Sequence, residues 1–266
     1  MEVYPAEQLC SERECLELLQ IGSLDMTKVS ASVMENFAPS FRVLGLPYLF
    51  RDAAHERVVL EGEIGQQLLE EARPQRLLGL AFYDAGSRSF YTRSTPIRRP
   101  RDLEGLKIRT QESPTAMALV RALGGAPTPL AWGELYSALQ QGVVDGAENN
   151  PASFYLSGHF EVARFLTLDE HTRVPDVLLI GTGSWGRLDG AEQEWLRKAA
   201  RDSVSRQRTL WQEHRERALA AVEAAGVTVI RPDKSLFVER TESIKGNFAD
   251  SEELRSLLGS IRHAGE

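Results

Sequence analysis

The sequence predicts an α/β protein built from two lobes, and two observations lead to this fold class. Residues 105–150 alternate short apolar segments with helical patterns, which is typical of a β-α-β-α-β unit. Residues 191–225 contain neither proline nor glycine and are followed by Gly226, which predicts one continuous helix. At about 1.5 Å per residue this helix would be roughly 50 Å long, so it is expected to lie across both lobes.

The composition is that of an ordinary globular protein, with 42% hydrophobic and 26% charged residues. Apolar runs are too short to predict a membrane-spanning helix. The net charge of −7 and the pI near 5.4 argue against nucleic acid as a partner. An anionic ligand would therefore need a local cluster of basic side chains, because the overall field repels it.

The first part of the chain alternates helical and strand patterns. An amphipathic helix is expected over Glu12–Gln20, followed by a strand and its exit within Ser23–Ser30. His55–Glu71 is expected to be helical, either as one helix or as two pieces broken at Gly62 or Gly65. Leu77–Phe82 is typical of a buried strand, and the next strand begins within Gly86–Tyr91, where the chain is expected to pass to the second lobe.

The central β-α-β-α-β unit is expected to present three side chains at the ends of its strands. Strands are predicted at residues 106–109, 127–130 and from 143 onward, with helices beginning at Ser113-Pro114 and at Gly133. Arg109, Trp132 and Asn149 then follow successive strands, and ligands of such sheets lie at the carboxyl ends of the strands.

Arg109 is the principal candidate for gripping an acid. The fork of a guanidinium matches a carboxylate through two hydrogen bonds and cannot lose its proton. The start of the helix at Ser113-Pro114 would add a partial positive charge nearby. The spacing is equally compatible with Arg109 as a surface ion-pair partner and Trp132 as a core residue.

Arg88 is the second arginine of interest. It lies on a strand expected to run beside residues 106–109, which would bring two guanidiniums into one neighbourhood. Two like charges close together are unfavourable unless a nearby anion neutralises them, so this arrangement would favour a bound carboxylate. The alternative is that Arg88 pairs with Asp84 or Asp102 at the surface.

The cysteines are not expected to form a disulfide. Cys10 and Cys15 are five residues apart around a predicted helix start, and positions i and i+5 of a helix do not face each other. Neither is close in sequence to further cysteines or histidines, so a metal site is not expected either. Both are expected to be unpaired thiols, with Cys15 the more buried.

Residues 181–186 satisfy the G-x-G-x-x-G pattern of dinucleotide-binding loops and follow an apolar strand at 177–180. That motif also needs a helix opening inside it and an acidic residue at the end of a second strand. Here the long helix follows instead, so no nucleotide cofactor is expected. A coiled coil is the weaker reading of that helix, because its apolar positions do not keep a heptad.

The chain beyond the long helix is expected to add a strand at 227–230 and one or two helices that pack on the second lobe.

Three long motifs resemble one protein family. They are Gly105-Leu-Lys-Ile-Arg109, Gly124-Gly-Ala-Pro-Thr-Pro-Leu-Ala-Trp132-Gly-Glu-Leu-Tyr136 and Ala138-Leu-Gln-Gln-Gly-Val-Val-Asp-Gly-Ala-Glu-Asn-Asn150. Together with a match running from Tyr4 to about Pro232, they resemble the substrate-binding proteins of tripartite ATP-independent periplasmic (TRAP) transporters.

The resemblance implies a two-domain fold like that of periplasmic binding proteins, with the long helix as its spine. It places residues 1–85 and 175–214 in the first α/β lobe and residues 86–174 and 215–266 in the second.

Further motifs narrow the resemblance. Residues 147–150, 153–155 and 168–172 resemble the members that bind hexuronates such as glucuronate and galacturonate. The resemblance implies a periplasmic binding protein that captures a small organic acid and delivers it to the membrane subunits of the transporter. It implies neither catalysis nor a cofactor nor a metal.

The resemblance also implies a set of ligand-contacting residues on both lobes. The second lobe would supply Arg109, Arg88, Asn149 and Trp132, and the first lobe Glu12, Arg13, Lys28 and Ser30. His171 and Asp176 lie where the chain passes the cleft again; Asp176 would suit vicinal hydroxyls. Lys28 could instead be a solvated lysine, and His171 a hydrogen-bonded structural histidine.

The N-terminus departs from the family pattern. Met1-Glu-Val-Tyr-Pro5 has no basic region and no apolar run, so no signal peptide is expected here. Relatives have a strand and a helix ahead of this point, and their loss would leave an open sheet edge. Such an edge invites pairing with another chain, so self-association is expected.

Other function classes remain open from the sequence. A lyase or isomerase acting on sugar acids would need a metal cluster or a poised acid–base pair, and no suitable cluster is visible. A ligand-sensing module of a signalling receptor would share the same cleft. A shortened chain that binds little is the third alternative.

Overall fold

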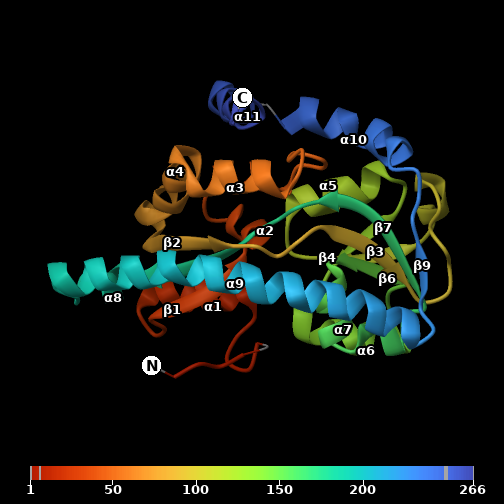
Figure 1. The fold of residues 1–266 in the computed structure, drawn as a ribbon, viewed down its shortest axis with the longest axis horizontal. Coiled ribbons are helices and arrows are strands. Elements are labelled where there is room, and N and C mark those ends of the chain that lie inside the picture. The colour runs from red at the N-terminus through yellow and green to blue at the C-terminus, as the bar shows by residue number, and fades with distance from the viewer. Residues whose placement is uncertain (1, 6, 249–250, 266) are drawn as a thin grey trace.

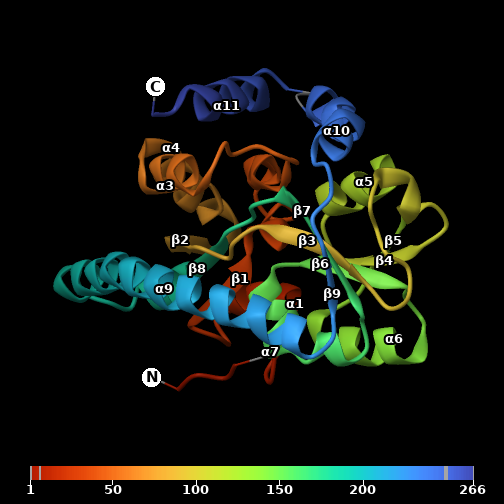
Figure 2. The same ribbon diagram turned by 45° about the vertical axis from the view of Figure 1, so that its right-hand side comes forward.

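The computed structural model describes residues 2–5, 7–248 and 251–265 and shows an α/β fold with two separate sheets (Figures 1 and 2). The first sheet is antiparallel and has the order β1 (Met26–Ser30), β8 (Asp176–Gly181), β2 (Leu77–Tyr83). The second has the order β5 (Ala126–Pro129), β4 (Lys107–Thr110), β6 (Gly146–Asn149), β3 (Arg88–Thr92), β7 (Phe165–Thr172), β9 (Thr228–Ile230).

The helices around the first sheet begin and end where local sequence requires. Helix α1 (Glu12–Ile21) starts in a capping box between Ser11 and Glu14 and ends at Gly22, which is left-handed. The predicted helix over residues 55–71 is confirmed in two pieces, α3 (Ala53–Glu61) and α4 (Glu63–Glu71). It breaks at Gly62, where a Cβ atom would come within 2.7 Å of the Val58 carbonyl oxygen.

The predicted β-α-β-α-β unit is confirmed as β4, α5 (Pro114–Ala122), β5, α6 (Leu135–Gln141) and β6, and its three strands are parallel. Its third strand starts at Gly146, so the expected start at residue 143 is wrong. The backbone N–H groups of Val143 and Val144 donate to Ala138 O and close the end of α6 instead. The strand can begin only after this turn.

The expected neighbourhood of Arg88 is also corrected. Its strand, β3, does not run beside β4, because β6 lies between them and pairs with both. In the parallel unit, β6 pairs with the edge of β4 that β5 leaves free, and β3 then pairs with β6 in antiparallel orientation. Arg88 therefore faces residues of β6 and β7 first.

Helix α9 (Gly190–Ala224) is the predicted long helix, and it runs across the whole molecule in Figure 1. It contacts β2 of the first sheet and α7 (Pro151–Leu156) beside the second, so the expectation that it lies across both is confirmed. Two short crossovers, residues 84–87 and 173–175, join the sheets. Gln207 of α9 holds the first crossover by accepting from the Asp84 N–H at 3.1 Å and donating to Asp84 O at 2.7 Å.

The C-terminal part forms α10 (Ser235–Phe248) and α11 (Glu252–His263) on the face that also carries α3, α4 and α5 (Figure 1). Helix α10 packs on α5 and β7. Helix α11 packs on α4 and on the short helix η1 (Pro39–Gly45), which both belong to the predicted first lobe. The expectation that the C-terminal helices pack on the second lobe is therefore wrong for α11. His55 Nε2 lies 2.8 Å from Ile261 O and ties this helix down.

The remaining elements are short helices at turns and strand ends; they are α2 (Ala31–Met34), α8 (Thr182–Trp185), η2 (Arg73–Gln75), η3 (Pro100–Leu103), η4 (Trp132–Glu134) and η5 (His159–Glu161). Within the described part of the chain, none of the helices combines the length and apolar character needed to cross a membrane.

Candidate functional site

A cavity of about 930 Å³ lies between the two sheets, and both contribute side chains to it. Most of the predicted binding residues line it. They are Glu12, Lys28, Ser30 and Asp176 from the first lobe and Arg88, Arg109, Trp132 and Asn149 from the second. The two sets belong to segments far apart in sequence, and the fold brings them to one hollow.

Arg109 stands at the end of β4 with 3% of its surface exposed. Its Nε donates to Leu130 O at 2.9 Å, and its Nη1 is buried without a hydrogen-bond partner among the described residues. The Trp132 ring centre lies 5.5 Å from the guanidinium carbon. Burial lowers the pKa of Arg109, because it penalises the charged form. A buried cation with unused donors is a site for an anion.

Arg88 is buried and already has an anionic partner. Its Nε donates to Glu148 Oε2 at 2.5 Å and its Nη2 to Glu148 Oε1 at 2.9 Å, which is a bidentate pair. Burial opposes the charged form, but Glu148 outweighs it and raises the pKa of Arg88. The surface pairing with Asp84 or Asp102 is therefore wrong. Because Glu148 answers the charge, Arg88 does not by itself require a bound carboxylate.

Glu148 also contacts a second charged pair, which His171 forms with Asp169. His171 is fully buried, with Nδ1 2.7 Å from Asp169 Oδ2 and Nε2 3.5 Å from Glu148 Oε2. Burial opposes its charge, yet Asp169 and Glu148 raise the pKa of His171 to about 9. Burial likewise opposes the charge of Glu148, yet Arg88 and His171 lower the pKa of Glu148 to about 2. His171 does not line the cavity, so its position fits the alternative of a hydrogen-bonded structural histidine.

The buried charges of the second lobe beside the cavity balance except at one group. Arg88 and His171 are positive, and Glu148 and Asp169 are negative, so this buried cluster is neutral. Arg109 is left with no carboxylate at ion-pair distance among the described residues. The second lobe therefore presents one uncompensated positive charge to the cavity.

Asn149 lines the cavity together with the two arginines. Its Oδ1 accepts from Arg88 Nη1 at 3.3 Å, and from the backbone N–H and Nδ2 of Asn150 at 2.8 and 3.0 Å. This leaves the Asn149 NH₂ group as a donor toward the cavity.

The ring of Trp132 packs against an uncharged histidine, His159. Its ring centre lies 4.9 Å from that of His159, and His159 Nδ1 lies 2.9 Å from the Tyr91 hydroxyl. Burial and the charge of Arg109 lower the pKa of His159 to about 4, so the ring is neutral near pH 7. The indole is thereby held against Arg109 as an apolar wall of the cavity.

The first-lobe wall carries a salt bridge. Lys28 Nζ lies 2.7 Å from Asp176 Oδ2, on the adjacent strands β1 and β8. Asp176 raises the pKa of Lys28, so the lysine stays charged. Half of the Lys28 side chain is exposed, so its ammonium is partly solvated as well as paired with Asp176. Asp176 has one oxygen engaged and the other available to accept from a ligand.

Glu12 joins the two lobes. Its Oε1 accepts from the Ser30 N–H at 2.7 Å, and its Oε2 accepts from Gln111 Nε2 at 3.1 Å. Burial raises the pKa of Glu12. Gln111 follows β4 and lines the cavity, but the sequence reading missed it; its position two residues after Arg109 was the available signal.

Arg13 lies outside the cavity lining. It is half exposed and pairs with Glu17 at 3.2 Å and with Glu112 at 3.6 Å. Successive helix residues are rotated by about 100°, so Arg13 and Glu12 cannot point the same way.

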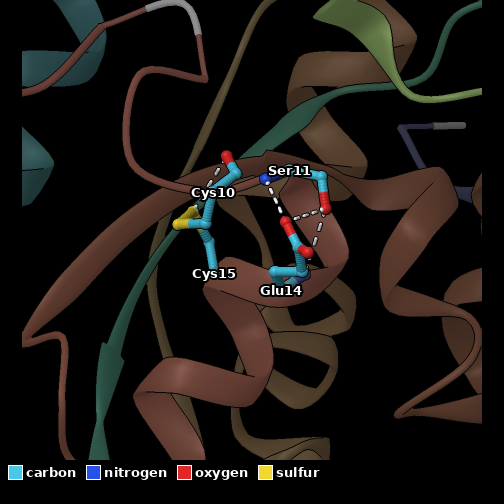
Figure 3. The surroundings of a disulfide bond; sticks show 4 residues. All are labelled: Cys10, Ser11, Glu14 and Cys15. Carbon is cyan, nitrogen blue, oxygen red and sulfur yellow. Dashed lines mark hydrogen bonds between the residues drawn. A yellow bond between two sulfur atoms is a disulfide. The ribbon is translucent and has the colours of Figure 1, made fainter.

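Cys10 and Cys15 form a disulfide, so the expectation of two free thiols is wrong (Figure 3). The helical spacing argument fails because Cys10 lies ahead of the N-cap residue Ser11 and is not part of α1. The chain turns there and brings the two Cα atoms to 5.4 Å, within the range of a disulfide. The burial is also the reverse of that expected, since Cys10 is buried and Cys15 is partly exposed.

Comparison with known proteins gives a consistent assignment. Residues 1–251 match the family described as bacterial extracellular solute-binding protein, family 7. The chain is similar to a TRAP periplasmic solute-binding protein from Bradyrhizobium sp. BTAi1, solved with α/β-D-galacturonate. The two share 43% identity with a TM-score of 0.96, over 98% of this chain and 87% of that one.

Two further proteins are similar over most of the chain. A TRAP periplasmic solute-binding protein from Xanthobacter autotrophicus Py2, solved with β-D-galacturonate, has 39% identity and a TM-score of 0.96 over 99% of this chain and 88% of that one. The C4-dicarboxylate-binding periplasmic protein DctP of Rhodobacter capsulatus is 35% identical over 86% of this chain and 68% of its own length. The chain therefore belongs to family 7 of the bacterial extracellular solute-binding proteins, the DctP family.

Proposed function

We propose that this chain captures a hexuronate such as galacturonate or glucuronate and delivers it to the membrane subunits of a TRAP transporter. The observation that carries the proposal is the buried guanidinium of Arg109 in a cavity between two lobes; among the described residues, one of its nitrogens has no partner and no carboxylate lies at ion-pair distance. The similar proteins solved with galacturonate support the choice of ligand class.

The ligand carboxylate would lie against Arg109, with the NH₂ group of Asn149 as a further donor. Arg88 would contribute mainly by holding Asn149, since Glu148 already balances its charge. Trp132 would cover the apolar face of the sugar ring.

The opposite wall would contact the ring hydroxyls through Glu12, Lys28, Ser30 and Asp176. Hydroxyls both donate and accept, so they suit a wall that contains carboxylates and an ammonium. Arg13 and His171, which lie outside the lining, are assigned no direct contact.

The charge of this wall favours a polyhydroxy monocarboxylate over a dicarboxylate. Glu12 and Asp176 carry two carboxyl groups against the single ammonium of Lys28. A second ligand carboxylate placed there would meet a like charge, whereas hydroxyls would find acceptors. The proposal therefore separates this chain from its C4-dicarboxylate-binding relative.

A thermal-shift screen tests the proposed ligand class. D-Galacturonate and D-glucuronate should raise the unfolding temperature by an amount that grows with the logarithm of the ligand excess, because they bind only the folded state. Succinate and malate at the same concentrations should raise it far less. A response to the dicarboxylates equal to that of the uronates would contradict the assignment, and so would no response to either uronate.

By its family, the chain is further proposed to work in the periplasm, to carry no catalytic activity and to use no cofactor. Self-association through the edge strand β1 is proposed as well, because β1 pairs only with β8 among the described strands. A monodisperse monomer in light scattering at high concentration would count against this last point.

A further inference from the structure

We propose that the Cys10–Cys15 disulfide positions Glu12 and thereby sets the affinity of the cavity for its ligand. The inference rests on the proposed function, in which Glu12 contacts ligand hydroxyls. Glu12 lies between the two cysteines in sequence, and all three residues line the cavity. The bond therefore closes a short loop around a residue of the binding wall.

The disulfide fastens α1 at its weakest point. The first turn of a helix has backbone N–H groups without helical partners and frays most easily. Figure 3 shows the sulfur bridge on one side of this turn and the capping box of Ser11 and Glu14 on the other. The capping box consists of hydrogen bonds at 2.8 and 3.4 Å, whereas the disulfide is a covalent tie to the preceding segment.

Glu12 needs this fixed position because it serves two partners at once. One carboxylate oxygen accepts from Ser30 N–H in the first lobe, and the other from Gln111 beside the second. Both contacts depend on where the first turn of α1 places the Glu12 backbone. Fraying of that turn would move the carboxylate away from Ser30 and Gln111, and from the ligand hydroxyls.

The segment ahead of the disulfide adds a second link across the cavity. Glu7 Oε2 accepts from the Gly133 N–H at 2.8 Å, directly after Trp132. Cys10 ends this segment and the disulfide joins it to α1. The bond thus connects two carboxylates, at positions 7 and 12, that each reach across to the second lobe.

A water-soluble phosphine opens the bond in a balanced reaction. The disulfide gains two electrons and two protons and becomes two thiols, while the phosphine is oxidised to its oxide with oxygen taken from water. Calorimetric titration with D-galacturonate then compares oxidised and reduced wild-type protein. Affinity should fall roughly tenfold on reduction, the scale of one hydrogen bond to a charged group.

Two variants separate positioning from general loosening. The C10S/C15S double variant should bind as weakly as the reduced wild type, and the phosphine should leave its affinity unchanged. In Glu12→Gln, reduction should change the affinity by less than twofold, because the charged group that the disulfide positions is already lost. An equal loss on reduction in wild type and Glu12→Gln would overturn the proposal, as would no loss in the wild type.

A readout without ligand keeps this proposal separate from the proposed function. The Ser30 amide donates to Glu12, so its hydrogen exchange, followed by NMR in ligand-free protein, should quicken on reduction while amides in β8 keep their protection. Unchanged exchange at Ser30 would overturn the positioning role. Failure of the oxidised protein to bind any uronate would instead refute the proposed function, and the Ser30 measurement would still decide this one.

Discussion

At the scale of single residues, the feature that matters most for binding is the Arg109 guanidinium, which has no counter-ion among the described residues. Arg88, His171, Glu148 and Asp169 neutralise one another, whereas Arg109 lines the cavity with an unused donor and has no carboxylate at ion-pair distance among the described residues. A ligand carboxylate can therefore complete the charge balance without displacing an existing ion pair.

Replacing Arg109 tests this balance. Arg109→Ala should weaken uronate binding by roughly 2–5 kcal/mol, the scale for removing one partner of a buried charge pair. Arg109→Lys should also weaken it, because the charge stays but the two-pronged geometry is lost. Arg13→Ala is the matched control, since Arg13 is half exposed and lies outside the cavity lining; its affinity should stay that of the wild type. Calorimetry giving wild-type affinity for either Arg109 variant would refute the anchor.

The buried His171 makes stability depend on pH. Its pKa in the folded protein is about 9, above the ordinary value near 6.5, so the folded state holds the proton more tightly. The resulting stabilisation, at most about 3 kcal/mol, is complete below pH 6.5 and is lost as pH rises through 9. Urea unfolding at pH 6 and 9.5 should show a larger loss for wild type than for His171→Gln. Equal losses would mean that the folded protein holds His171 neutral.

The sequence could supply the kinds of side chain at the strand ends but not their partners. Arg109, Trp132 and Asn149 could be placed at the cavity because each follows a strand of one parallel unit. Glu148 could not be recognised as the partner of Arg88, because the order of β3, β6 and β4 depends on long-range pairing. Residue spacing carries no information about that order.

At the scale of elements, α9 and the two crossovers hold the lobes together. The length of α9 was predictable from the lack of proline and glycine, and its contacts with both sheets follow from that length. The Cys10–Cys15 bond was not predictable, because a helical period was applied to a residue that precedes the helix. The predicted helix and α1 both begin at Glu12, so helical spacing did not apply to Cys10.

The hold of α9 on the first crossover can be measured. Gln207→Ala removes both hydrogen bonds to the Asp84 backbone and should lower the free energy of unfolding by about 1–2 kcal/mol. Gln212→Ala is the matched control, because Gln212 is exposed on the same helix; it should change stability by less than about 0.5 kcal/mol. Equal denaturant midpoints for the two variants would show that the clamp contributes nothing.

At the scale of the whole molecule, the net charge and the site act against each other. A charge of −7 repels an organic anion from most of the surface, so recognition depends on the local field between the lobes. The fold creates that field by converging a parallel unit, an antiparallel sheet and the start of α1 on one cavity. This convergence followed from the family resemblance, and composition alone could not have indicated it.

The most direct test compares two sugars that differ only at C6. D-Galacturonate carries a carboxylate there, and D-galactose carries a hydroxymethyl group on the same ring. Calorimetric titration of the oxidised protein should show binding of D-galacturonate and at least a hundredfold weaker binding of D-galactose, because a lost partner to a buried charge is worth roughly 3 kcal/mol or more. Comparable affinities for the two sugars would contradict a carboxylate held by Arg109.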